Sequence, residues 1–197
     1  MVPAALGARA GVEAVVVGGS AGAVAALGEV LPKLPADFPP VLVVVHVLPS
    51  TPHLLAELFA PRCAMRVLEA ESFAAIERGC VYFAPADYHL LVTRDRRCAL
   101  SIEPPVNFSR PSIDVLFESA AVAFGPSLVG VVLTGASHDG AEGARVIAEG
   151  GGRTLVQEPA TTEVPVMPAA VLAAVPSAHA VPLAGMASAL RAMVMAP

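Results

Sequence analysis

The sequence predicts an α/β fold, a three-layer doubly wound architecture in which a mainly parallel sheet carries an inserted antiparallel β meander. Short apolar runs rich in valine alternate with segments of helical character, and this alternation builds a parallel sheet. Hydrophobic residues make up 55% of the 197 residues and charged residues only 15%. An average protein has roughly 25% charged residues, so this composition indicates strands that are buried on both faces.

Each apolar run marks one expected strand of the parallel sheet. The expected strands are Ala14–Val17, Val41–His46, Met65–Leu68, Leu128–Thr134 and Thr154–Gln157. Helices are expected to begin near Ala21, near Pro52 with Ser50 or Thr51 as cap, near Ser112 with Asp114 in the first turn, near Gly140 and near Met167, and a final helix to cover Ala184–Met195. In the middle, the short β-like runs Cys80–Phe83, His89–Thr93 and Cys98–Ile102 predict the antiparallel meander.

Length and composition favour a single domain over residues 14–197, preceded by a loose leader over residues 1–13. No segment offers the roughly 20 continuous apolar residues that a membrane span requires, and the first residues lack the basic character of a secretory signal.

A net charge of -5 argues against a nucleic-acid partner. Three cysteines without C-x-x-C spacing indicate neither a disulfide framework nor a zinc site. We therefore expect a cytoplasmic protein with no metal and no cofactor.

The turn after the first expected strand has the spacing G-x-S-x-G, met by Gly18, Ser20 and Gly22. Glycines allow a sharp strand-to-helix turn that presents a nucleophile, and the helix start supplies free N–H groups for an oxyanion. Such turns also bind dinucleotides or simply pack a helix on a sheet. The dinucleotide alternative fits poorly, because Ser20 and Ala23 replace two of its glycines and His46 replaces its ribose-binding acid.

Reactive residues follow several of the expected strands. Ser20, His46 and Asp139 come at or just after strand ends, and in an open α/β sheet this edge holds the ligand crevice. They can serve as nucleophile, base and orienting acid, with His46 expected within about 3.5 Å of the Ser20 hydroxyl. Structural alternatives remain for each: a helix cap for Ser20, a core histidine bonded to backbone for His46, and a cap of the helix at Gly140 for Asp139.

The chain order Ser, His, Asp differs from the Ser, Asp, His order of α/β-hydrolases. From about Ala14 to Leu190 the sequence resembles the catalytic domain of the bacterial chemotaxis protein-glutamate methylesterases. The stretches that carry the resemblance are Gly18-Gly19-Ser20-Ala21-Gly22, Val45-His46-Val47-Leu48-Pro49, Ala84-Pro85-Ala86-Asp87-Tyr88-His89-Leu90, Arg110-Pro111-Ser112-Ile113-Asp114-Val115-Leu116-Phe117, Leu133-Thr134-Gly135 with Asp139-Gly140, and Met167-Pro168.

This resemblance implies a serine hydrolase that removes methyl groups from glutamate γ-methyl esters on the cytoplasmic helices of methyl-accepting chemoreceptors and deamidates some receptor glutamines. It implies Ser20, His46 and Asp139 as the catalytic triad, and the backbone N–H groups of Ala21 and Ala136 as the oxyanion hole. Members of the family often carry an N-terminal receiver domain, which this chain lacks. It is then either an isolated catalytic domain or a protein controlled otherwise, for instance by a separate receiver or regulatory protein.

The sequence also departs from the family pattern. Ser20-Ala21-Gly22-Ala23 stands for Ser-Thr-Gly-Gly, and Gly135-Ala136-Ser137 stands for Gly-Met-Gly. Ser137 is expected to be strained if the replaced glycine needs a positive φ. These changes motivate a second hypothesis, a catalytically weak methylesterase-like interaction module, and a nucleotide-binding α/β module is a third. The remaining histidines, His53, His89, His138 and His179, form no metal-binding pattern, and only His138 lies near the predicted site.

Overall fold

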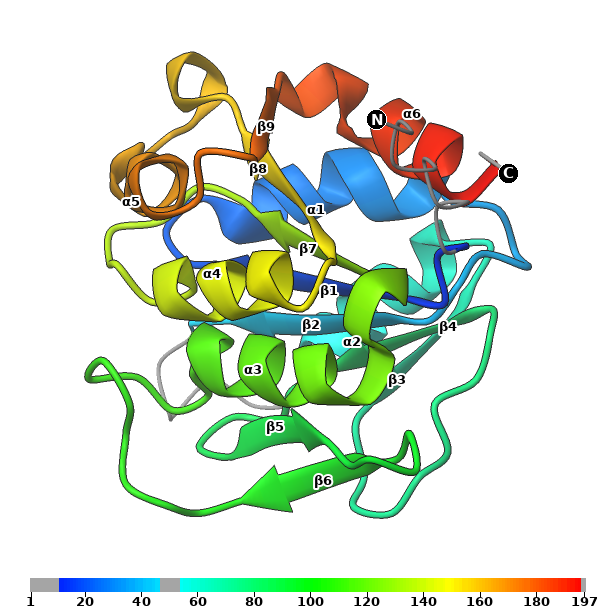
Figure 1. Cartoon of the computed structure of the whole chain (residues 1–197). Helices are drawn as coiled ribbons and strands as arrows, with labels where there is room; N and C mark the ends of the chain where they lie inside the picture. Colours follow the sequence, from blue (N-terminus) through cyan, green and yellow to red (C-terminus); the bar gives the residue numbers. More distant parts are fainter. Residues whose placement is uncertain (1–10, 47–53, 196–197) are drawn as a thin grey trace, which may run out of the picture.

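The computed structural model describes residues 11–46 and 54–195, which fold into three layers with a sheet between two sets of helices (Figure 1). The sheet is seven-stranded and parallel, in the order β3-β4-β2-β1-β7-β8-β9. Its strands are β1 (Ala14–Gly19), β2 (Val41–Val45), β3 (Arg66–Glu69), β4 (Cys80–Phe83), β7 (Leu128–Val132), β8 (Arg153–Gln157) and β9 (His179–Val181). A separate antiparallel pair, β5 (His89–Val92) and β6 (Cys98–Ser101), packs beside α3.

Helices cover both faces of the sheet, so the sheet separates two hydrophobic cores. On one face lie α1 (Ala23–Val30), α2 (Leu54–Phe59) and α6 (Leu183–Met195), and on the other α3 (Ile113–Phe124), α4 (Ala141–Glu149) and α5 (Val166–Ala174). Short 3-10 turns occupy Leu31–Lys33, Ala60–Arg62, Gly125–Ser127 and Pro159–Thr161. Along β1, Val15 and Val17 enter the first core and Val16 the second. This alternation explains the uninterrupted valine runs, because both faces of each central strand are buried.

Most of the expected elements are confirmed, but the three-stranded meander is wrong in one strand. Cys80–Phe83 is β4, which pairs in parallel with both β2 and β3 inside the main sheet. All of its residues are buried, which suits an interior strand rather than a half-exposed hairpin. Only β5 and β6 are antiparallel. The short edge strand β9 was not predicted at all.

The helix starts agree with expectation for α3, α4, α5 and α6 to within about two residues. The first helix begins at Ala23, also within two residues of the expected start near Ala21, because Gly22 adopts a left-handed conformation with φ of 79° just before it. The cap expected at Ser50 or Thr51 and residues 1–10 of the expected leader lie outside the described residues. In the part of the chain that the structure describes, no helix combines the length and apolar character needed to cross a bilayer.

The strand order places a switch point at the centre of the sheet. From β1 the chain runs to β2 on one side, and it later returns to β7 on the other side of β1. Loops that leave such strands in opposite directions open a crevice at their carboxyl ends. The site is therefore expected where β1, β2 and β7 end.

Candidate active site

The ends of β1, β2 and β7 are held together by backbone hydrogen bonds. His46 N–H, after β2, donates to the Gly19 carbonyl at 3.0 Å, and Ser20 N–H, after β1, donates to the Thr134 carbonyl at 2.9 Å. The loop after β7 also approaches Ser20 closely, since a Cβ built on Gly135 would lie 3.0 Å from Ser20 Cβ. The fold thus brings the loops that carry the predicted residues to one edge of the sheet.

His46 and Asp139 form a direct pair at this edge. His46 Nε2 lies 2.8 Å from Asp139 Oδ2, and the Asp139 side chain is fully buried while 13% of the His46 side chain is exposed. An ionised carboxylate can only accept hydrogen bonds, so Nε2 carries the proton. The neutral imidazole then has its lone pair on Nδ1, the protonation state that a general base requires.

The Asp139 carboxylate is also bound to the start of α3. It accepts hydrogen bonds from the backbone N–H of Ile113 at 2.6 Å and of Asp114 at 3.2 Å, and from the Ser112 hydroxyl at 2.8 Å. Burial alone would raise the pKa of Asp139, but the hydrogen bonds from His46, Asn107, Ile113 and Ser112 outweigh it and hold that pKa below its usual value. The positive end of the helix dipole also favours the negative charge.

A second buried carboxylate, Asp114, makes the reciprocal contact. Its Oδ1 accepts the N–H groups of Gly140 at 2.9 Å and Gly143 at 2.7 Å, at the start of α4. Asn107 Nδ2 bridges the two acids, donating to Asp114 Oδ2 at 2.7 Å and to Asp139 Oδ1 at 3.0 Å. Burial and the nearby Asp139 charge raise the pKa of Asp114 to about 6, against the opposing hydrogen bond from Gly143. Asp139, which precedes α4, therefore caps the start of α3, and Asp114, which lies in α3, caps the start of α4.

These contacts decide the structural alternatives. Asp139 does not cap the helix that follows it, because α4 has Gly140 at its N-cap without a side-chain bond and the carboxylate caps α3 instead. Ser20 does not cap α1, whose N-cap is Gly22. His46 is bonded through its ring to Asp139 rather than to backbone. The three structural alternatives are therefore wrong: a cap of α1 for Ser20, a backbone-bonded histidine for His46 and a cap of α4 for Asp139.

A hydroxyl that sequence reasoning missed lies beside the free imidazole nitrogen. Ser109 Oγ is 3.5 Å from His46 Nδ1, whereas no hydrogen bond joins Ser20 and His46 among the described residues, contrary to the expected contact. Ser109 is remote from His46 in sequence and follows no strand of the sheet, so no local signal marked it. A serine hydroxyl reorients by rotation about χ1, and catalytic contacts are often loose without substrate.

Unpaired backbone N–H groups lie next to Ser20. Neither Ala21 nor Ala136 has an acceptor for its backbone N–H within residues 11–46 and 54–195, and both residues are exposed. The N–H groups of both serines are themselves paired, that of Ser20 with the Thr134 carbonyl and that of Ser109 with the Val106 carbonyl. Strain at Ser137 was expected only if its φ were positive. Ser137 is not among the described residues with positive φ, so this condition is not met, and its hydroxyl accepts the Asp139 N–H at 3.2 Å.

No other histidine in the described part of the chain is hydrogen-bonded through its ring to His46 or Asp139. His89 is buried, its Nδ1 accepting the Ser112 N–H and its Nε2 donating to the Pro104 carbonyl, both at 3.2 Å. His138 is exposed in the loop after β7, and His53 lies outside the described residues. Within the described ranges no group of histidine, cysteine or acidic side chains is arranged to hold a metal ion.

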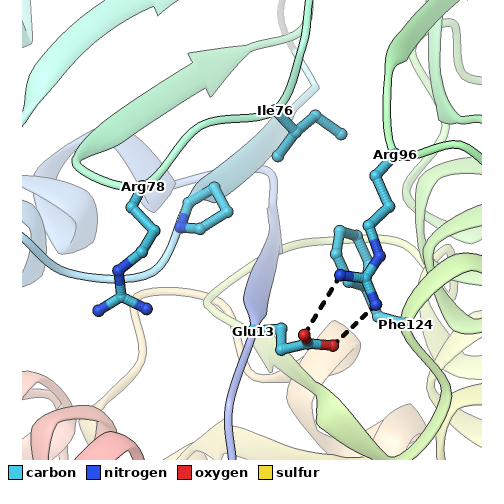
Figure 2. Close-up of a pocket in the computed structure, with 6 residues that line it drawn as sticks. Glu13, Ile76, Arg78, Arg96 and Phe124 are labelled. Carbon is cyan, nitrogen blue, oxygen red and sulfur yellow. Dashed lines mark hydrogen bonds and ion pairs between the residues drawn. The ribbon is translucent and has the colours of Figure 1, made fainter.

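A pocket of about 250 Å³ lies at the amino-terminal ends of the strands, away from the candidate site. Its lining includes Glu13 and Pro40, which precede β1 and β2 (Figure 2). Arg96 lines the pocket. Its guanidinium donates two hydrogen bonds to the Glu13 carboxylate, at 2.8 and 3.2 Å, and lies 4.9 Å from the centre of the Phe124 ring. These charges compensate each other. The pocket contains none of the predicted site residues.

Comparison with known proteins agrees with this architecture. The family model described as CheB methylesterase matches residues 15–190. A Leptospira interrogans protein is 43% identical over 163 residues, covering 82% of this chain and 84% of its own length. A Nocardioides protein-glutamate methylesterase/protein-glutamine glutaminase is 42% identical over 171 residues, covering 85% of this chain but 47% of its own length. This chain therefore spans about half of that relative.

A solved structure extends the comparison to the fold. The crystal structure of the Thermotoga maritima CheB methylesterase catalytic domain superposes with a TM-score of 0.88 at 29% identity, covering 94% of this chain and 100% of that chain. The family model spans the segment that contains Ser20, His46 and Asp139. The chain therefore belongs to the CheB methylesterase family.

Proposed function

We propose that this chain is a protein-glutamate methylesterase that hydrolyses glutamate γ-methyl esters on the cytoplasmic helices of chemoreceptors and deamidates receptor glutamines at the same site. The observation that carries the proposal is the His46–Asp139 pair at the sheet edge where Ser20 lies, which leaves Nδ1 without a proton and with the Ser109 hydroxyl 3.5 Å away. The names of the relatives support the substrate class, because the Nocardioides protein is a protein-glutamate methylesterase/protein-glutamine glutaminase.

In the proposed first step, the Ser20 hydroxyl attacks the ester carbonyl and His46 Nδ1 takes its proton. Asp139 keeps the other ring nitrogen protonated and stabilises the imidazolium that forms. The negative charge that develops on the carbonyl oxygen is stabilised by the N–H groups of Ala21 and Ala136, which have no acceptor in the described part of the chain. Nδ1–H then protonates the departing methoxide, which leaves as methanol.

The second step reverses these roles. A water molecule gives a proton to Nδ1 and attacks the glutamyl ester of Ser20, and the imidazolium returns that proton to the serine oxygen. The products are a receptor glutamate and free enzyme. With a glutamine substrate the leaving group is ammonia, and the same groups serve.

The interaction-module hypothesis has lost part of its motivation. It rested on the replacements at Ala23, Ala136 and Ser137, yet Ser137 carries no positive φ and the Ala136 N–H is unpaired among the described residues. Backbone donors depend on chain path rather than on side chains. A catalytically weak interaction module would bind the receptor without releasing methanol.

The test is methanol release from a methylated receptor fragment, together with labelling by a fluorophosphonate probe. Wild-type protein is expected to release methanol and to be labelled on Ser20, and Ser20→Ala to do neither. Labelling of Ser109 instead would assign the nucleophile to the second hydroxyl. Receptor binding without release or labelling would favour the interaction module.

A further inference from the structure

A two-residue turn lies beside the catalytic edge, in the loop between β6 and α3. Val106 N–H donates to the Ser109 carbonyl at 3.1 Å, and Ser109 N–H donates to the Val106 carbonyl at 2.9 Å. Between them Asn107 and Phe108 have φ values of 50° and 62°. Positive φ at both central positions defines a type I′ turn, which asparagine followed by glycine fits best. Phenylalanine at the second position is therefore strained.

Both neighbours of Phe108 contact the proposed catalytic groups. Asn107 Nδ2 donates to Asp139 at 3.0 Å, and Ser109 Oγ lies 3.5 Å from His46 Nδ1. Phe108 itself points away from the protein, with a relative exposure of 104%. The turn thus presents an aromatic ring to solvent at the lip of the site.

Stability does not explain a phenylalanine at this position. A fully exposed ring buries no apolar surface, and the backbone conformation favours glycine. Strain that is kept without a stabilising contact points to function. The loop that carries the ring is anchored, because Arg110 donates to the Ile102 carbonyl at 2.9 Å and to Asp87 Oδ1 at 2.7 Å. Ile102 is 71% exposed and Val106 38%, so further apolar side chains of this loop face solvent.

We propose that Phe108 is a substrate-contacting residue that packs against an apolar side chain of the helix that carries the ester. This inference rests on the proposed function. A γ-ester on a helix must reach Ser20 while the helix itself stays outside the site, at its lip. Side chains three or four positions away lie on the same helix face, about 5–6 Å from the target residue. Phe108 therefore selects amphipathic helices with an apolar residue one turn from the methylated glutamate.

The test uses two coiled-coil peptides, each with one surface glutamate γ-methyl ester. In one peptide the positions three and four residues before and after the ester are leucine, and in the other they are serine. Methanol release gives kcat/KM for each, with p-nitrophenyl acetate as a small ester. Wild-type protein is expected to prefer the leucine peptide by about tenfold or more, mainly through KM. Phe108→Gly is expected to reduce this preference to below about threefold, and Phe108→Tyr to retain it.

Phe73→Gly is the matched control. Phe73 is also a phenylalanine with a left-handed backbone, with a φ of 67° and 77% exposure. Its N–H donates to the carbonyl of Cys98 at the start of β6, whereas the turn at Val106–Ser109 follows the other end of that strand. This variant is expected to keep the leucine preference. The inference is overturned if Ser20-dependent demethylation shows no leucine preference, or if Phe108→Gly keeps it. If neither peptide is demethylated while p-nitrophenyl acetate is hydrolysed, the proposed substrate is wrong and the inference fails with it.

Discussion

Replacing Asp139 by asparagine should damage catalysis and stability together. The carboxylate accepts five hydrogen bonds, from His46, Asn107, Ser112 and the N–H groups of Ile113 and Asp114. An asparagine side chain has only one acceptor oxygen. Its NH₂ group must therefore replace either Oδ2 or Oδ1 and face the donors that this oxygen accepts from in the aspartate. If it faces His46, the ring can bond to it only with the proton on Nδ1, and that nitrogen can no longer accept the proton of Ser20. We expect kcat to fall by about 10⁴ from this change of tautomer.

The stability loss follows from the same geometry. Hydrogen bonds to an ionised acceptor contribute roughly 1.5–3 kcal/mol each, and the two helix N–H groups donate to different oxygens, Ile113 to Oδ2 and Asp114 to Oδ1. The amide keeps one of these bonds, and relief from burying a charge offsets part of the loss. The expected net cost is about 2 kcal/mol, which corresponds to a fall in Tm of roughly 4–8 °C for a chain of this size.

Calorimetry and methanol release measured on the same preparation test both expectations. Ser112→Ala is the control, because it removes one donor to Asp139 Oδ1 without changing the partner of His46. It is expected to lower Tm while keeping kcat within about tenfold. If Asp139→Asn lowers Tm but also keeps kcat within about tenfold, the aspartate is a cap of α3 only and the reasoning about the tautomer is refuted.

Three further outcomes are expected. Ser20→Ala should lower kcat by about 10⁴ or more, and retention of a tenth of the activity would exclude Ser20 as nucleophile. Ser109→Ala should change kcat by less than about tenfold, because the unpaired N–H groups of Ala21 and Ala136 lie on the loops at Ser20 and not at Ser109; a loss as large as that of Ser20→Ala would reverse the assignment. Asp114 has its pKa raised from 3.8 to about 6, so its stability contribution is fully present below about pH 4 and lost as pH rises through about 6. Denaturant unfolding at pH 4.5 and 7.5 should therefore show a larger fall in stability for wild type than for Asp114→Asn, and equal falls would contradict the raised pKa.

The sheet and the edge that holds the candidate site were predictable because they follow from local patterns. Valine runs at Val15–Val17 and Val41–Val45 mark strands buried on both faces, and all carboxyl ends of a parallel sheet meet at one edge. Ser20, His46 and Asp139 could therefore be grouped without knowing any contact. The strand β4 was misplaced because a short apolar run does not reveal its partners. Its neighbours β2 and β3 precede it in the chain, with a helix between them.

The exchange of caps between α3 and α4 could not be predicted from the sequence. Capping rules consider residues next to the helix start, which made Asp139 a candidate cap for the helix at Gly140. In the structure each acid serves the other helix: Asp139 binds Ile113 and Asp114 binds Gly143. These partners are 26 and 29 residues apart in sequence. Only the packing of α3 against α4 brings them together, so the orientation of the base depends on tertiary structure.

The turn at Val106–Ser109 was missed for a related reason. An Asn-Gly pair is the usual sequence signal for a two-residue turn, and here Phe108 stands in place of the glycine. The backbone still turns, because Asn107 tolerates a positive φ and its amide binds two buried carboxylates. Those contacts fix the turn strongly enough to hold a strained residue beside it. Phe108, which hides the usual sequence signal of the turn, thus also carries the exposed aromatic ring beside the site, where we propose that the substrate helix lies.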